Sequence, residues 1–141
     1  QGYFYWLDQS GRLPGARLCN ELEWERAARG ADGRVYPHGD GLRPDDVNID
    51  ATYGRQPAAF GPDAVGAHPA SVSPFGLFDM AGNAFELTRS MSADLGRVVL
   101  RGGSWYYDRS GARVDNRTAG GSTQRDVLVG TRVCASFTPR P

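Results

Sequence analysis

The sequence predicts a single domain of mixed helix-and-strand class, in which irregular segments outweigh regular structure. Its 141 residues suffice for one domain with a hydrophobic core and are too few for two ordinary ones. The 19 glycines and 9 prolines place turns throughout the chain. One segment carries the signals of a complete helix, and residues that favour strands occur only in short runs. We therefore expect one domain over residues 1–141.

The clearest helix begins after Asn20, which is a favourable N-cap. Glu23 stands three residues later, and this is the spacing of a capping box. Acidic residues occupy the first turn and arginines the last, as the helix dipole favours, and Gly30 can end the helix. We expect Trp24 and Leu22 on flanks of the helix that face the core.

Regular periodicity is lost between about residues 33 and 74, where Gly, Pro, Asp and Asn recur. Such a long irregular stretch inside a compact domain is usually functional or tied down by a metal. Residues 75–88 form a turn-rich segment that we expect to be half-buried. β-Branched residues concentrate at 97–101, 112–114 and 127–137, which are the predicted strands.

Charge and hydropathy argue against two kinds of partner. The 16 basic and 16 acidic residues give a formal net charge of zero, whereas non-specific nucleic-acid binding relies on an excess of Lys and Arg. No apolar run approaches the roughly 18 residues that a membrane span needs. The first residues include no initiator Met and do not have the pattern of a signal peptide, so we expect a piece of a longer protein.

Several motifs occur in a fixed order along the chain and point to a family. They are LCNELEWERAARG at 18–30, YPHGD at 36–40, PFGLFDMAGNAFE at 74–86, LRGGSW at 100–105, NR at 116–117 and VGTRV at 129–133. Together they resemble the formylglycine-generating, sulfatase-modifying family over residues 16–137. The resemblance implies a C-type-lectin-like α+β fold, rich in loops, with small twisted antiparallel sheets. It covers the C-terminal portion of the family domain, because the family's earlier half has no counterpart here.

The resemblance also implies that the family's chemistry is lost. The family enzyme oxidises a substrate cysteine to formylglycine with copper that two cysteines hold, at fixed offsets after Gly-Gly-Ser. Those positions are Tyr107 and Ala112 here, and neither supplies the thiolate that copper(I) prefers. A tryptophan that follows the Asn-x-x-Glu segment in the family is replaced by Leu87. We therefore expect no bound copper.

A calcium site is a further implication of the resemblance. In the family, the segment at 74–86 binds calcium through Asn and Glu side chains and neighbouring carbonyls, which correspond to Asn83, Glu86, Ala81, Gly82 and Ala84. Calcium takes about six to eight oxygen ligands, and an irregular loop exposes carbonyls. The alternative is that Asn83 supports a turn and Glu86 pairs with an Arg.

Residues 105–111 form the predicted ligand-binding surface. Trp105 is expected to be buried, but large amphipathic residues follow it on a Gly-rich loop. In binding loops of this composition Tyr and Arg anchor the partner, while Ser and Gly adapt. An ordinary packed loop is the alternative. The predicted ligand-binding residues are Tyr106, Tyr107, Asp108, Arg109, Ser110, Asn116, Arg117, Thr118, Arg125 and Asp126.

These observations predict a non-catalytic module that recognises a protein or peptide ligand. The motif at 18–30 resembles bacterial versions of the domain attached to Ser/Thr protein kinases, where it would act as a sensor. The motifs at 101–105, 113–117 and 129–132 resemble the variable proteins of diversity-generating retroelements. The alternative is a metal-dependent oxidase or oxygenase of the formylglycine-generating or sulfoxide-synthase type, completed by the missing half, with a metal at His38 or His68. A cytoplasmic location is slightly favoured.

Two cysteines, Cys19 and Cys134, lie far apart in the sequence. Neither belongs to a CxxC pair, so a zinc site has no support. They form one disulfide or stay two buried thiols, depending on the compartment. Each stands beside a family motif in segments that we expect to pack together, so their Cα atoms should lie within the ~7 Å limit for a disulfide.

Overall fold

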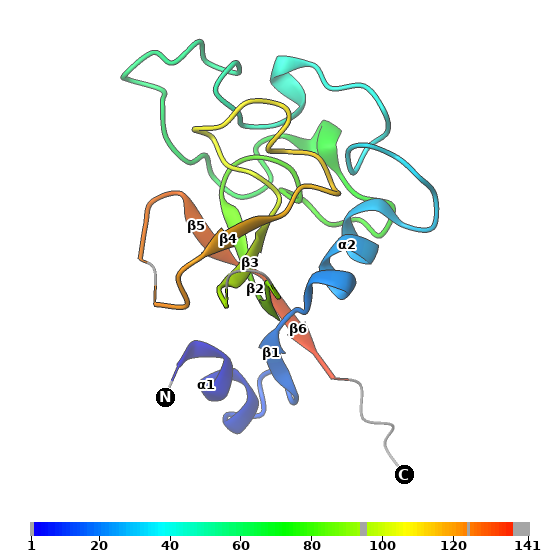
Figure 1. The fold of residues 1–141 in the computed structure, drawn as a ribbon, viewed down its shortest axis with the longest axis vertical. Helices are drawn as coiled ribbons and strands as arrows, with labels where there is room; N and C mark the ends of the chain where they lie inside the picture. Colours follow the sequence, from blue (N-terminus) through cyan, green and yellow to red (C-terminus); the bar gives the residue numbers. More distant parts are fainter. Residues whose placement is uncertain (1, 94–95, 124, 137–141) are drawn as a thin grey trace.

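Two small sheets and two helices form one end of the molecule, and long loops form the other (Figure 1). The computed structural model describes residues 2–93, 96–123 and 125–136. The elements in order are the helix α1 (Tyr3–Gln9), β1 (Ala16–Leu18), the helix α2 (Glu21–Arg29), the 3-10 turns η1 (Pro44–Asp46) and η2 (Pro69–Ser71), β2 (Phe85–Met91), β3 (Val98–Arg101), β4 (Thr118–Gly120), β5 (Val129–Thr131) and β6 (Val133–Ala135).

The sheets confirm the predicted α+β class and correct one detail of it. β1 pairs with β6 in an antiparallel two-stranded sheet, and the second sheet has the order β4-β3-β2-β5. β3 is antiparallel to both β2 and β4, whereas β5 runs parallel to β2. The expectation of antiparallel sheets therefore holds for the other strand pairs and is wrong for β2 and β5, because the chain passes from β4 across β3 and β2 before it forms β5.

The helix α2 forms as predicted. Asn20 Oδ1 accepts a hydrogen bond from the Glu23 N–H at 2.8 Å, and the Glu23 carboxylate accepts one from the Asn20 N–H at 2.8 Å. Arg17 also hydrogen-bonds both oxygens of Glu23, which lowers the pKa of that carboxyl to about 2. Trp24 is buried, but Leu22 is 74% exposed, so its expected place against the core is wrong.

Other element predictions meet mixed outcomes. The strand at 97–101 is confirmed as β3, and the run at 127–137 divides at Arg132 into β5 and β6, with residue 137 outside the described ranges. The strand at 112–114 is wrong. There Val114 donates its N–H to the Val35 carbonyl and accepts from the Arg101 side chain, so its backbone groups are satisfied without a ladder. The strand β2 begins inside the predicted turn-rich segment at 75–88 and continues beyond it, and no strand was predicted there.

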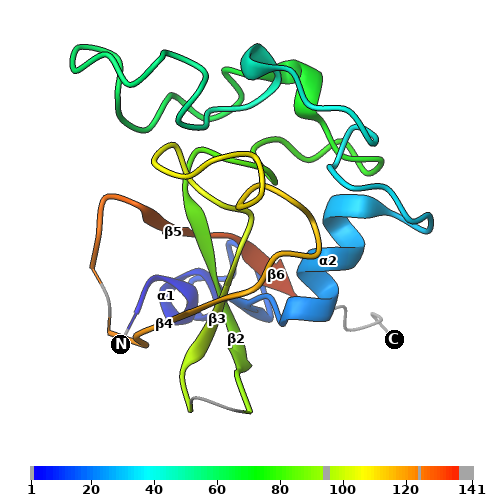
Figure 2. The ribbon, with the colours of Figure 1, turned by 45° about the horizontal axis from the view of Figure 1, so that its top comes forward.

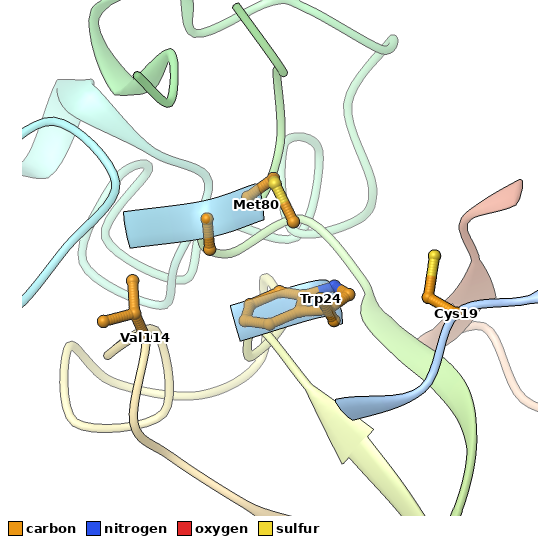
Figure 3. Packing of buried hydrophobic residues seen from close by; sticks show 5 residues of the cluster. Cys19, Trp24, Met80 and Val114 are labelled. Atoms are coloured by element: carbon orange, nitrogen blue, oxygen red, sulfur yellow. The ribbon is translucent and has the colours of Figure 1, made fainter. Parts of the chain in front are cut away.

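The core lies between α2 and the second sheet. The Trp24 side chain lies at its centre, with Met80, Val114 and Cys19 around it (Figure 3). A second cluster, under the loops, consists of Tyr36, Val47, Ile49, Ala81 and Ala112.

The cysteine prediction is confirmed. Cys19 and Cys134 form a disulfide with a Cα–Cα distance of 5.0 Å. Cys134 lies in β6 and Cys19 directly follows β1, so the bond closes the two-stranded sheet and links segments 115 residues apart. In the described part of the chain, no helix has the length and apolar character of a membrane span.

Side chains rather than regular elements hold the long irregular segment in place. Asn83, in the left-handed region with φ of 62°, donates its N–H to the Asn48 carbonyl at 2.8 Å. Its side-chain oxygen accepts from the Asp63 N–H at 2.8 Å, and its side-chain amide donates to the Asp63 carbonyl at 3.3 Å. Asn48 in turn donates to the Gly61 carbonyl at 2.9 Å. These bonds fix residues 48–63 against the start of β2 and so position the site described next.

Candidate functional site

Four aromatic side chains meet at the loop end of the molecule and form what we call the aromatic face: Phe60, Trp105, Tyr106 and Tyr107. The Phe60 ring lies 4.6 Å from the Trp105 ring and 5.6 Å from the Tyr106 ring, measured between centroids. The Tyr106 and Tyr107 centroids are 5.7 Å apart. Tyr106 is 47% exposed and Tyr107 is 46% exposed. Figure 2 shows the loop around residues 103–112 beneath the loop of residues 50–62.

Sequence reasoning identified the two tyrosines but missed Phe60. Phe60 lies in an irregular segment of Ala, Pro and Gly with no periodicity, 45 residues before Trp105 in the sequence. Hydrogen bonds between Asn83 and Asp63 and between Asn48 and the Gly61 carbonyl bring that segment to the loop. No signal in the sequence alone predicts this contact.

The loop that carries the tyrosines has a fixed backbone. The Trp105 N–H donates to the Asn83 carbonyl at 3.0 Å, and the Asp50 N–H donates to the Tyr107 carbonyl at 3.1 Å. The Asn116 side chain donates to the Gly111 carbonyl at 3.0 Å. A rigid loop loses little conformational entropy when it binds, which favours affinity.

Within this loop the predicted ligand residues have two different roles. Asp108 accepts hydrogen bonds from the Ser110 hydroxyl at 2.5 Å and the Ser110 N–H at 2.9 Å, and these bonds lower the pKa of its carboxyl. Asp108 and Ser110 therefore shape the turn. Arg109 is exposed, and within the described residues no hydrogen bond or ion pair engages its guanidinium. Arg109 and the two tyrosines are the side chains available to a partner.

The remaining predicted ligand residues do not all join this face. Arg117 makes a two-pronged ion pair with Glu21 at 2.6 and 2.8 Å, which commits it to the start of α2. Thr118 begins β4. Arg125 and Asp126 lie before β5, where the Asp126 carboxylate caps the turn by accepting from the Leu128 N–H at 2.9 Å.

The two positions that hold copper in the resembled family carry no thiol, and they lie in different surroundings. Ala112 is fully buried in the second core cluster. Tyr107 faces outward, with its ring packed on Phe85 at 5.3 Å. Gly103 (φ 77°) has no room for a side chain, because an added Cβ would meet the Gly111 carbonyl at 2.7 Å. This part of the site can position a ligand but offers no soft metal ligand.

The side chains predicted to bind calcium do not converge. Both oxygens of Glu86 are engaged, by Arg132 at 2.6 and 2.8 Å and by the Trp24 indole N–H at 2.6 Å. The Asn83 side chain is bonded to Asp63 instead. Burial raises the pKa of Glu86, and the Arg132 guanidinium opposes that rise. In this arrangement Asn83 and Glu86 do not form a calcium site together.

A second carboxylate lies near Glu86 and changes the calcium prediction. Asp79, which was not in the predicted set, lines the same cleft of about 510 Å³ and adds to the rise in the pKa of Glu86. Asn83 and Ala84 line this cleft as well, while Ala81 and Gly82 are buried. Asp79 and Glu86 with nearby carbonyls are hard oxygen donors of the kind calcium prefers, but an ion would compete with Arg132 for Glu86. Calcium binding by Asn83, Glu86 and the neighbouring carbonyls stays a prediction, to which Asp79 adds a second carboxylate.

The two histidines named for the oxidase alternative lie in different surroundings. His68 is buried, with its two nitrogens 2.9 Å from the Asp45 carbonyl and 2.8 Å from the Asp63 carboxylate. His38 stacks on Tyr36 and lies 3.4 Å from the Asp46 carboxylate. Both nitrogens of His68 are therefore already used. Within the described residues, no three His, Cys, Asp or Glu side chains form a group that could hold a metal ion.

The fold and this site define a formylglycine-generating-enzyme-like domain whose copper positions are replaced. The sequence matches the sulfatase-modifying factor enzyme 1-like domain over residues 2–137, and the chain belongs to that family. It is 37% identical over 142 residues to the inactive C-alpha-formylglycine-generating enzyme 2 of Bos taurus, a match that covers 90% of this chain and 46% of the relative. The formylglycine-generating enzyme of Mycobacterium tuberculosis is 40% identical over 85 residues, covering 55% and 28% of the two chains. The chain spans about half the length of the bovine relative and less of the mycobacterial one.

Solved structures share the fold. PvdO from Pseudomonas aeruginosa matches with a TM-score of 0.78 and 24% identity over 96% of this chain and 57% of its own. Treponema denticola variable protein 1 matches with a TM-score of 0.70 and 24% identity over 84% and 46% of the two chains. CarF matches with a TM-score of 0.71 and 20% identity over 87% and 48%. At these identities the likeness establishes the fold alone.

Proposed function

We propose that this domain is a non-catalytic module that binds a protein or peptide ligand through the aromatic face and Arg109. The observation that carries the proposal is the pair of replaced copper positions: Ala112 is packed in the core, and Tyr107 is presented to solvent. Both relatives named inactive formylglycine-generating enzymes, from Bos taurus and Mus musculus, cover 90% of the chain, which supports the same conclusion.

The shape of the surface supports a macromolecular partner. Tyr and Trp supply large contact areas at low cost in conformational entropy, and Arg adds a directional charge. Here Tyr106, Tyr107 and Arg109 project from a loop whose backbone is already fixed. A sensor domain of a kinase and a variable protein would both use such a face, and the likeness in fold to the Treponema protein is compatible with the latter.

Binding is tested with peptides selected from a displayed random library. Wild-type protein should bind the selected peptides, and Tyr106→Ala or Tyr107→Ala should weaken binding by roughly thirtyfold, as expected for an interface aromatic worth about 2 kcal/mol. Tyr5→Ala is the matched control, since Tyr5 is 48% exposed but lies on α1. If Tyr5→Ala and Tyr106→Ala weaken binding equally, the aromatic face is not the site.

Catalysis is tested separately. The protein, supplied with copper and a cysteine-containing peptide, should consume no oxygen and form no aldehyde. Clear turnover would overturn the non-catalytic proposal and favour the oxidase alternative, and metal analysis of the whole protein would then identify the ion.

The disulfide bears on location. Disulfides persist in oxidising compartments and are rare in the cytosol, so the Cys19–Cys134 bond favours a compartment other than the cytoplasm expected from the sequence. Trapping free thiols in protein taken directly from its cells tests this. Two alkylated cysteines would return the preference to the cytoplasm.

A further inference from the structure

His68 occupies a position that requires it to carry a positive charge. One ring nitrogen faces the Asp45 carbonyl oxygen at 2.9 Å, and the other faces the Asp63 carboxylate at 2.8 Å. Both partners accept hydrogen bonds and neither can donate one. A neutral imidazole has a single N–H, so one of its nitrogens would present a lone pair to an oxygen. Only the imidazolium, with two N–H groups, satisfies both contacts. We call this arrangement of Asp45, His68 and Asp63 the His68 bridge.

The charges around the bridge favour the same state. His68 is 9% exposed, and burial has the largest influence on its pKa and lowers it. The hydrogen bonds to Asp63 and the Asp45 carbonyl, with the negative charges of Asp63 and Asp79, outweigh burial and leave the pKa of His68 raised. Tyr53 donates its hydroxyl to the same Asp63 oxygen at 2.8 Å, and this contact raises the pKa of Tyr53. The element η1 adds the carboxylates of Asp45 and Asp46, and His38 lies 3.4 Å from the Asp46 carboxylate.

The His68 bridge controls the segment that supplies Phe60 to the aromatic face. Asp63 follows Phe60 by three residues, and its backbone is bonded to the Asn83 side chain through both its N–H and its carbonyl. Asn83 in turn accepts the N–H of Trp105, against whose ring Phe60 packs. Residues 53–63 contain turns but no helix or strand, so these contacts, together with the Asn48 bond to the Gly61 carbonyl, order them.

We propose that the His68 bridge makes the aromatic face dependent on pH: protonated His68 holds residues 53–63 so that Phe60 completes the face, and loss of that proton releases the segment and weakens ligand binding. This inference rests on the proposed function and adds a regulatory element to it. The direction of the pH effect follows from the linkage between proton binding and folding. A group whose pKa is higher in the folded state contributes stability that is complete below its unfolded pKa, about 6.5, and lost as pH rises through the folded pKa.

The direct test is the protonation state of His68 and the opening of the Asp63 amide, both measured by NMR on the intact protein. Nitrogen shifts of His68 should show two N–H groups at about pH 7. Protection of the Asp63 amide from hydrogen exchange, corrected for the intrinsic pH effect, should fall as pH rises from about 6.5 through the folded pKa of His68, roughly tenfold for each unit by which the two pKa values differ. A neutral imidazole at pH 7, or protection that does not change with pH, would overturn the inference.

Matched variants separate the bridge from general effects of pH. His68→Gln is neutral at every pH, so its Asp63 amide should be weakly protected throughout and show no pH step. His38→Gln removes the neighbouring histidine and should behave as the wild type does. The selected peptides should bind the wild type more tightly at pH 6.5 than at pH 9, and this difference should vanish in His68→Gln. If the peptides bind equally at both pH values while the Asp63 amide opens, the regulatory inference is overturned. If the wild type binds no peptide at any pH, the proposed function is overturned instead.

Discussion

Reduction of the Cys19–Cys134 disulfide should cost the domain a large part of its stability. The bond links residues 115 apart, nearly the full length of the chain. In the chain-entropy relation, a loop of that length restricts the unfolded state by about 16 cal/mol/K, which is about 4.8 kcal/mol at 25 °C. Domains of this size are typically stable by about 5–15 kcal/mol. The reduced protein should therefore have a much smaller free energy of unfolding.

Local structure gives a second reason for a large effect. The bond joins the start of the chain to β6 across a sheet of only three residue pairs. β6 follows directly after Arg132, which pairs with Glu86. When the bond is broken, this short sheet and a few contacts with β2, such as the Arg89 N–H to the Cys19 carbonyl, must keep α1 and β1 against the rest of the molecule. Strand pairs of this length have little stability of their own.

Urea unfolding of the oxidised and the reduced wild type measures the effect. The free energy of unfolding should fall by several kcal/mol on reduction, with a lower urea midpoint. The double variant Cys19→Ala and Cys134→Ala should match the reduced wild type and show no response to the reductant. If the free energy of unfolding falls by less than about 1 kcal/mol in both comparisons, the reasoning is refuted, because the loop constraint would then be offset elsewhere.

Three other predictions follow from the site. Gly82→Ala should destabilise the domain by at least about 2 kcal/mol more than Gly76→Ala. Both glycines have φ above 70°, but only at Gly82 would the new Cβ lie 2.3 Å from the Asn48 carbonyl oxygen. Equal melting temperatures of the two variants would contradict this prediction. Arg132→Gln should lower the free energy of unfolding by about 3–5 kcal/mol, because it leaves the buried Glu86 carboxylate without its cation. This loss of stability should be smaller at acidic pH, where Glu86 takes up a proton. Denaturant unfolding at two pH values checks both points. A chelator should lower the melting temperature of the wild type but not that of Asp79→Asn, and identical wild-type curves with and without chelator would exclude a structural calcium ion.

The parts of the fold that sequence reasoning predicted are those with local physical signals. The capping box at Asn20 and Glu23 defines the start of α2 through contacts three residues apart. β3 is a run of four buried residues with two adjacent valines, and its strand pattern is equally local. The proximity of Cys19 and Cys134 was predictable only through the resemblance to the family, because their spacing contains no geometric information.

The parts that could not be predicted depend on long-range contacts. Leu22 has the apolar character and spacing of a core residue, but α2 packs on the sheet through Trp24, and Leu22 remains on the outside. Ala112 and Val114 are buried as strand residues would be, yet Val114 packs beside Trp24 of α2 and Ala112 beside Tyr36 and Val47, and neither belongs to a strand. Phe60 is placed by the bond between nearby Asp63 and Asn83, and His68 contacts the Asp63 carboxylate. The segment around them has no periodicity. A pattern-based prediction has no access to such bonds.

In the proposed function, the two replaced copper positions account for a family domain that binds a ligand without oxidising it. A copper site needs both side chains to face the same small volume with soft donor atoms. In this chain Ala112 faces the core, where it completes the cluster of Tyr36 and Val47, and Tyr107 faces solvent beside Tyr106. The backbone between them is fixed independently, by the Asn116 side chain and by the close contact of Gly103 with Gly111. Because these contacts fix the loop, its exposed side chains can serve the proposed recognition while the buried ones serve stability.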